Sequence, residues 1–183
     1  MVDKQDNLKD LQTIYNPHAA RDYKEGCDKG ILHSYIDIYS KIFSPYRTKS
    51  INILEIGVAS GHSLLMWEEY FTKANIYGID LTPIPDIIKD HSRITYYEGD
   101  ATQIQPNIFP DTVFDIIIDD GDHKLASQVF TICLFSKRIK SGGLYIIEDI
   151  WVEKNIEYFQ TFGDISIYGR RRRDDRMFAI KMK

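Results

Sequence analysis

The sequence lacks any apolar run of about twenty residues, so it predicts no membrane span. The N-terminal stretch MVDKQDNLKDLQTIYN also lacks the apolar centre of a signal peptide. Cysteine is scarce: the 2 residues, Cys27 and Cys133, lie far apart and fit no zinc-binding spacing. Together these absences predict reduced thiols and a cytoplasmic location.

Excess positive charge is also missing, because the formal net charge is −4 and the pI is near 5.7. General nucleic-acid binding is therefore not expected. The run Arg170-Arg171-Arg172-Arg173 is a local exception between two apparent strands. A solvated hairpin turn is its simplest interpretation, and a grip on an anionic group of a substrate is the alternative.

Three signatures of common nucleotide-binding enzymes are absent. The chain has no GxGxxG, no P-loop GxxxxGK[ST], and no Tyr-x-x-x-Lys couple of the Rossmann-type reductases. In their place stands the loop "LEIGVASGHS" (54–63). Its Gly57 permits a tight turn close to a ligand, and its Gly61 begins a helix without a side chain in the way.

What the chain does contain is a succession of short apolar runs and segments of helical period. Strands are expected at 51–56, 75–80, 93–100, 114–120, 143–149, 164–169 and 176–182. Helices are expected at 61–72, 84–90, 124–139 and 153–161. Alternation of this kind predicts an α/β fold: a Rossmann-like, doubly wound, seven-stranded sheet, mostly parallel, with a C-terminal antiparallel hairpin and helices on both faces.

The length of 183 residues predicts a single domain. Within it we expect an N-terminal extension (1–27), a leading helix (28–46) and a Rossmann-like core (51–183). In the 124–139 helix, Cys133 is expected to face the core, and Ser141-Gly142-Gly143 is expected to stop the helix.

Acidic residues gather where the predicted strands end, at the edge where such sheets bind ligands. They are Glu55, Asp80, Asp100, Asp119, Asp120, Glu148 and Asp149. Asp80 is placed to accept hydrogen bonds from ribose hydroxyls, Asp100 to border an adenine, and Glu55 to receive a cationic amino group. A carboxylate-lined pocket suits a positively charged nucleoside, and S-adenosylmethionine is such a ligand.

The motifs of the strands and loops together resemble those of a known enzyme family. The series "LEIGVASGHSLLMWEEYF…ANIYGIDL…EGD…FDIIIDDGDH…GGLYIIEDI" resembles class I S-adenosylmethionine-dependent methyltransferases over residues 28 to 183. It is most similar to the subgroup of metal-dependent macrolide sugar O-methyltransferases and cephalosporin hydroxylase-like proteins, in which a segment like "DKGILHSYIDIY" precedes the first strand. Ala59 replaces the middle glycine of many methyltransferases, as is common in this subgroup.

The resemblance implies S-adenosylmethionine and Mg²⁺ as cofactors. It implies Asp120, Glu148 and Asp149 as metal ligands and His123 as general base. Three carboxylates without thiolate neighbours independently suit a hard cation. Adjacent acids on a strand point to opposite sides, so Asp119 is expected to face the cofactor or to orient the loop, while Asp122 caps a helix.

The residues expected to bind the cofactor are Glu55, Gly57, Ala59, Gly61, Asp80, Asp100, Asp119 and Lys29. Lys29 would contact the cofactor's carboxylate, or simply be exposed.

Further candidates remain open. His33 and Tyr35 either line the site or pack in the core, and His62 lies near the cofactor's tail or has no role. Trp151 either walls the acceptor pocket or does not. The aromatic residues expected in the core are Trp67, Tyr70 and Phe71.

The sequence therefore predicts Mg²⁺-assisted O-methylation of a hydroxyl, most readily that of a sugar in a glycoside, nucleotide sugar or glycan. A homo-oligomer, in which a second subunit completes the acceptor site, is left open. Three alternatives also remain open: a catechol-type small-phenol methyltransferase, a hydroxylase-like enzyme on the same scaffold, and a non-catalytic S-adenosylmethionine-binding protein.

Overall fold

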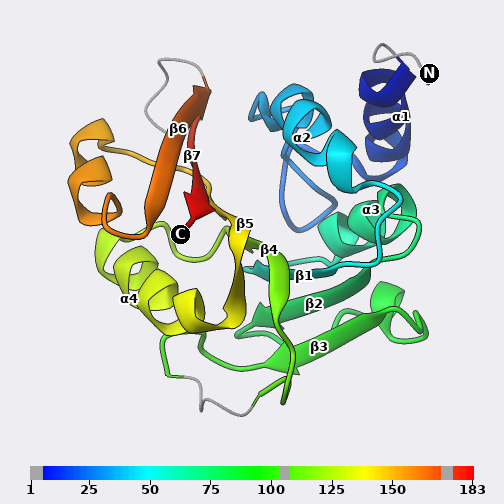
Figure 1. The fold of residues 1–183 in the computed structure, drawn as a ribbon. Helices are drawn as coiled ribbons and strands as arrows, with labels where there is room; N and C mark the ends of the chain where they lie inside the picture. Colours follow the sequence, from blue (N-terminus) through cyan, green and yellow to red (C-terminus); the bar gives the residue numbers. More distant parts are fainter. Residues whose placement is uncertain (1–5, 104–107, 170–174) are drawn as a thin grey trace.

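The computed structural model describes residues 6–103, 108–169 and 175–183. Seven strands form one sheet in the order β3-β2-β1-β4-β5-β7-β6 (Figure 1). Their bounds are β1 (Asn52–Ile56), β2 (Asn75–Asp80), β3 (Ile94–Glu98), β4 (Phe114–Asp119), β5 (Ile139–Ile147), β6 (Gly163–Gly169) and β7 (Arg176–Met182). The first five strands are parallel, and β7 pairs antiparallel with both β5 and β6. This confirms the predicted fold class.

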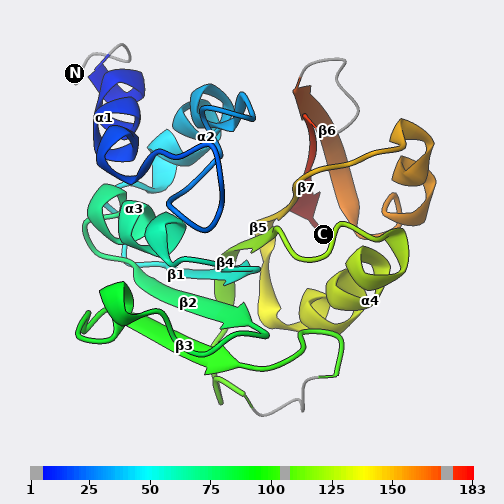
Figure 2. The same ribbon diagram turned by 180° about the vertical axis from the view of Figure 1, so that it is seen from behind.

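Helices cover both faces of the sheet, with α1 (Asp6–Tyr15), α2 (Tyr35–Phe43) and α3 (His62–Tyr70) on one side. On the other side lie α4 (Leu125–Phe135) and the short 3₁₀ helix η5 (Glu153–Tyr158) (Figure 2). The remaining 3₁₀ turns are η1 (Asn16–His18), η2 (Ser44–Tyr46), η3 (Asp86–Ile88) and η4 (Ser136–Arg138).

Strand alternation divides the apolar residues between two cores. On β1, Ile53 packs in the core beneath α1 to α3, while Leu54 packs in the core beneath α4. On β4, Ile116 and Ile118 join the first core and Ile117 the second. Because the central strands are buried on both faces, their sequences are near-continuous apolar runs.

Several predicted helices are shorter than expected. The leading helix was predicted over 28–46, but the structure has turns at 28–34 and helix only from Tyr35 to Phe43. Residues 29–30 are drawn inward: Lys29 is buried, and a Cβ on Gly30 would lie 2.6 Å from the Tyr15 ring. The segments 84–90 and 153–161 contain 3₁₀ turns in place of α-helix.

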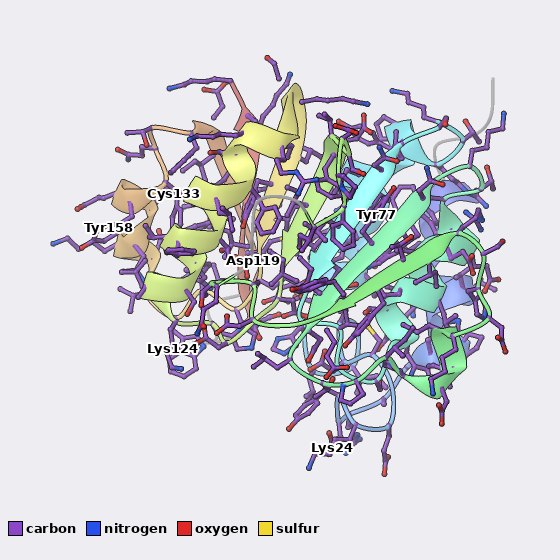
Figure 3. All side chains as sticks on the ribbon, turned by 90° about the horizontal axis from the view of Figure 1, so that it is seen from below. Lys24, Tyr77, Asp119, Lys124, Cys133 and Tyr158 are labelled. Carbon is purple, nitrogen blue, oxygen red and sulfur yellow. The ribbon has the colours of Figure 1, made fainter. Side chains whose placement is uncertain are left out.

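Two expectations for the 124–139 helix are wrong. Cys133 is exposed on α4 (Figure 3), because the buried face of that helix is formed by Gln128, Thr131, Ile132 and Phe135. Ser141-Gly142-Gly143 does not stop the helix: α4 ends at Phe135, η4 follows, and β5 already begins at Ile139.

The region 1–27, expected only as an extension, contributes to the core. Within it α1 is an α-helix whose Leu11 and Tyr15 are buried against α2 and α3. In the part of the chain that the structure describes, we find no helix of sufficient length and apolar character to cross a bilayer.

Candidate active site

The strand order reverses between β1 and β4, and a cavity of about 470 Å³ opens beyond their carboxyl ends. Its volume is within the range of small-molecule sites. The wall comes from the loop after β1, the ends of β2, β3 and β4, the start of α4, and residues 26–29. This is the edge where open α/β sheets bind ligands.

Close approach of two loops depends on Gly57. Its φ is +86°, and a Cβ there would lie 2.0 Å from the Asp120 carbonyl oxygen. The loops are tied together by the Asp120 amide, which donates to the Ile56 carbonyl at 2.8 Å. Ala59 also has a positive φ, 49°, and both residues line the cavity. Gly61, at φ +86°, caps the start of α3 and is not among the described lining residues.

Asp80 holds the loop after β1. One carboxylate oxygen accepts the amides of Val58 and Ala59 at 2.7 and 2.9 Å, and the other accepts the amide and hydroxyl of Thr82, each at 3.0 Å. Although burial acts in the opposite direction, these hydrogen bonds lower the pKa of Asp80.

The Asp100 side chain, which follows the neighbouring strand β3, is also held by hydrogen bonds. Its carboxylate accepts the hydroxyl and amide of Thr102 and the side-chain amide of Gln103, and these hydrogen bonds lower its pKa. Both Asp80 and Asp100 line the cavity.

Asp119 and Asp120 diverge, as strand alternation predicts. Asp119 is buried, and its carboxylate accepts the hydroxyls of Thr131 and Tyr145. Burial raises the pKa of Asp119 to about 6, with these hydrogen bonds opposing the rise. The side chain is thus hydrogen-bonded to α4 and β5, and Asp119 is among the residues that line the cavity; Figure 3 locates it beside α4.

Asp120, His123 and Asp149 converge at the opening. One ligating atom from each lies within 4.8 Å of the others, and His123 Nε2 is 3.6 Å from Asp149 Oδ2. Both His123 and Asp149 have positive φ, 57° and 52°, a strained conformation that aims their side chains together. His123 Nδ1 is buried without a hydrogen-bond partner among the described residues.

Glu148 turns away from that opening. Its carboxylate accepts hydrogen bonds from the Lys29 ammonium, at 2.7 Å, and from the Tyr39 hydroxyl. Burial and the Asp120 charge raise the pKa of Glu148 well above its usual range, and Lys29 opposes the rise. Neither Glu148 nor Glu55 is among the described residues that line the cavity.

Glu55 was expected to receive a cationic amino group of the cofactor; in the structure it is buried outside the cavity lining and lies beside the Lys29 ammonium. The Glu55 carboxylate is 3.4 Å from the Lys29 ammonium and accepts the Trp67 indole N–H at 2.9 Å. Trp67, Tyr70 and Phe71 are fully buried, so their core assignment is confirmed.

Tyr35 and His33 border the candidate metal site formed by Asp120, His123 and Asp149. The Tyr35 hydroxyl donates to the Asp149 carboxylate at 2.7 Å and accepts the Asp149 amide at 3.2 Å. His33 stacks on the Tyr35 ring, and its Nδ1 is 3.6 Å from the Asp149 carboxylate and 3.9 Å from that of Asp175. Both residues therefore border the site, and Tyr35 is also buried in the core.

Two further candidates, Trp151 and His62, are not among the described residues that line the cavity. Trp151 is 57% exposed. His62 contacts Ser60 and His18. Arg170–Arg173 falls outside the described residues. Asp122, which was expected to cap a helix, lines the cavity two positions before Lys124, the N-cap of α4, and accepts the Lys124 amide and the Ser127 hydroxyl.

The sequence did not predict the hydroxyl partners of the acids, which are Tyr39, Thr82, Thr102, Thr131 and Tyr145. The one signal in the sequence for such a partner is the spacing of Tyr35 and Tyr39. The two residues are four positions apart, on one face of the predicted leading helix.

A mostly parallel seven-stranded sheet with a nucleoside-sized cavity at its reversal point defines a Rossmann-like class shared with methyltransferases. The MycE methyltransferase from the mycinamycin biosynthetic pathway, solved with Mg, SAH and mycinamycin VI, superimposes with a TM-score of 0.69 at 22% identity. That alignment covers 97% of this chain and 55% of the MycE chain. A family model described as a methyltransferase domain matches residues 54–150, and the chain belongs to this family.

Curated relatives agree. Mycinamicin VI 2''-O-methyltransferase of Micromonospora griseorubida is 33% identical over 147 residues, which cover 73% of this chain and 35% of the relative. A rhamnosyl tetracenomycin-C 2'-O-methyltransferase of Streptomyces olivaceus is 32% identical over 142 residues, 69% of this chain and 36% of the relative. The chain thus spans about a third of the length of these relatives.

Proposed function

We propose that this protein transfers a methyl group from S-adenosylmethionine to a hydroxyl, with Mg²⁺ assistance, and that the hydroxyl belongs to a sugar. The observation that carries the proposal is the cavity's division into two parts. One part offers carboxylates and a glycine loop for a nucleoside; the other offers Asp120, His123 and Asp149 at hydrogen-bonding range of a shared point.

The nucleoside half is formed by Gly57, Ala59, Asp80 and Asp100. Gly57 allows the loop after β1 to pack against the Asp120 backbone, and Asp80 ends β2 while Asp100 follows the adjacent strand β3. The hydrogen bonds that lower their pKa keep both carboxylates charged near neutral pH. Charged acceptors suit the ribose hydroxyls and the amino group of adenosine.

The metal half fits a hard divalent cation. The side chains of Asp120 and Asp149 are 21% and 14% exposed at the cavity, whereas that of Glu148 is 2% exposed. Asp120 and Asp149 would therefore hold Mg²⁺ directly, with Glu148 as the third predicted carboxylate. Bound there, Mg²⁺ would lower the pKa of the acceptor hydroxyl and fix its direction.

His123 is placed to take the proton. As the acceptor oxygen forms its bond to the methyl carbon, the bond from that carbon to the sulfonium sulfur breaks, and the hydroxyl proton passes to the imidazole. The 3.6 Å separation of His123 Nε2 from Asp149 Oδ2 places the imidazole beside the carboxylate cluster. Tyr35 orients Asp149 from the other side.

A sugar acceptor is supported by the names of the relatives, which are O-methyltransferases acting on glycosylated macrolide or tetracenomycin compounds.

The net charge of −4 supports the absence of general nucleic-acid binding, and the two thiols support a cytoplasmic location. A homo-oligomer, in which a second subunit contributes contacts to the acceptor, remains part of the proposal.

The test is a screen of glycosides, nucleotide sugars and catechols with methyl-labelled S-adenosylmethionine, with and without EDTA. Label transfer to a sugar hydroxyl that EDTA abolishes is the expected result. Transfer to catechols alone would favour the small-phenol alternative, and metal-insensitive transfer would refute the role of the ion. Absence of S-adenosylmethionine binding in calorimetry would remove the proposal altogether.

A further inference from the structure

Lys29 places a cation inside the acidic cluster. Its ammonium lies 2.7 Å from Asp120, 2.7 Å from Glu148 and 3.4 Å from Glu55, and its side chain is 2% exposed. Burial acts to lower the pKa of this lysine, but the three carboxylates raise it well above its usual range. The three carboxylates around this ammonium make Lys29 the cation of a buried ion-pair cluster.

The arrangement concerns the metal site because two of the three carboxylates are predicted metal ligands. Asp120 is shared directly: one oxygen is bound to Lys29, and the side chain also belongs to the cluster with His123 and Asp149. Glu148 is engaged by Lys29 and Tyr39 and is almost fully buried. An ammonium and a divalent cation at the same carboxylates repel each other.

We propose that Lys29 is a tethered counter-cation that competes with the divalent ion for Asp120 and Glu148. It is a positioning residue: it holds both carboxylates in place in the metal-free protein and sets the affinity for the ion. The inference rests on the proposed function, in that it requires a divalent ion at this cluster. Glu148 becomes available as a ligand when the ammonium moves away.

Charge balance gives the direction of the effect. Replacing Lys29 by methionine keeps an unbranched side chain of similar length and leaves the buried Glu55 and Glu148 and the partly exposed Asp120 without their cation. Uncompensated buried carboxylates destabilise a protein, so the metal-free form of Lys29→Met should melt at a lower temperature. The same excess negative charge attracts a divalent ion, so Mn²⁺ should bind about tenfold more tightly or better.

The experiment is calorimetric titration of Mn²⁺ into wild type and Lys29→Met, with melting temperatures measured with and without Mn²⁺. Lys140→Met is the matched control, because it makes the same change at an exposed pair with Asp115 at the opposite edge of the sheet. The expected result is tighter binding and a larger Mn²⁺-induced rise in melting temperature for Lys29→Met alone. Unchanged or weaker binding by Lys29→Met would overturn the competition.

A second measurement covers the case in which Lys29→Met does not fold without metal. In wild-type protein with nitrogen-labelled lysine, the buried Lys29 ammonium resonance should shift, or exchange faster with water, as Mg²⁺ is added. A resonance that stays unchanged at saturating Mg²⁺ would overturn the proposal. If wild type binds neither ion, the metal part of the proposed function fails instead, so the two failures are distinguishable.

Discussion

On the β2 and β3 side of the cavity, Asp80 and Asp100 accept hydrogen bonds from Thr82 and Thr102, two positions further along the chain, and Asp80 also accepts two from the loop after β1. On the β4 and β5 side, Asp120 and Glu148 are held by Lys29, which lies 91 and 119 positions away. The first pair has lowered pKa values, whereas burial raises the pKa of Glu148.

The difference shows two ways to keep carboxylates at one sheet edge. Hydrogen bonds from neighbouring amides and hydroxyls stabilise the charged form locally, and they need no ion. Carboxylates packed together in a buried site need a cation, and the structure supplies one from Lys29. S-adenosylmethionine affinity of the nucleoside half should therefore change little when the ion is changed. The ion affinity of the metal half should change with any substitution that alters its charge.

The largest effect is expected for Asp120→Asn, which removes a predicted ligand and a partner of Lys29. The rate of methyl transfer should fall by about a thousandfold or more, because transition-state stabilisation by the ion is worth several kcal/mol. Initial rates with saturating acceptor measure it. Asp115→Asn, at the opposite end of the same strand, is the control. Activity of Asp120→Asn within tenfold of wild type would contradict the metal assignment.

His123→Ala should be next, lowering kcat by roughly a hundredfold to ten-thousandfold, which is the usual contribution of a general base. S-adenosylmethionine affinity in calorimetry should stay the same, since the imidazole acts on the acceptor proton. His91→Ala, whose ring pairs with Glu68 away from the cavity, is the matched control. Full activity of His123→Ala would show that another group accepts the proton.

Much of this comparison follows from the sequence. The alternation of side chains along β4 predicted that Asp119 and Asp120 point to opposite faces, and the structure confirms it: Asp119 contacts Thr131, and Asp120 contacts Lys29. β4 and β5 are neighbours in the sheet, and this pairing brings Asp120 near Asp149.

The sequence could not place Lys29. Periodicity predicted a helix over 28–46, which would have put Lys29 on a helical surface, whereas the chain turns at 28–34 and directs it inward. Contacts across more than a hundred positions leave no periodic signal, so the pairing of Lys29 with Glu148 emerges only from the packed structure. Cys133 was assigned to the wrong side of α4 because the buried face of that helix includes the polar residues Gln128 and Thr131, which an apolar period does not mark.

Asp80→Asn should separate the two halves. One Asp80 oxygen accepts the amides of Val58 and Ala59, and the other accepts the amide and the hydroxyl of Thr82. The new side-chain NH₂ group replaces one of these oxygens, and loss of such a charge-assisted pair weakens the loop by about 1–3 kcal/mol. We expect S-adenosylmethionine affinity to fall by about tenfold or more and Mn²⁺ affinity to stay within threefold, both by calorimetry. Equal losses for the two ligands would mean that the halves are coupled.

The smallest effect is expected for Tyr35→Phe, which removes one hydroxyl from Asp149 and keeps the buried ring. A single hydrogen bond of this kind contributes about 1 kcal/mol, so Mn²⁺ affinity should fall by roughly threefold to tenfold. Tyr158→Phe, at an exposed ring, is the control for loss of a hydroxyl. Tighter Mn²⁺ binding in Tyr35→Phe would mean that the hydroxyl, like Lys29, occupies ligand capacity of the carboxylate instead of orienting it.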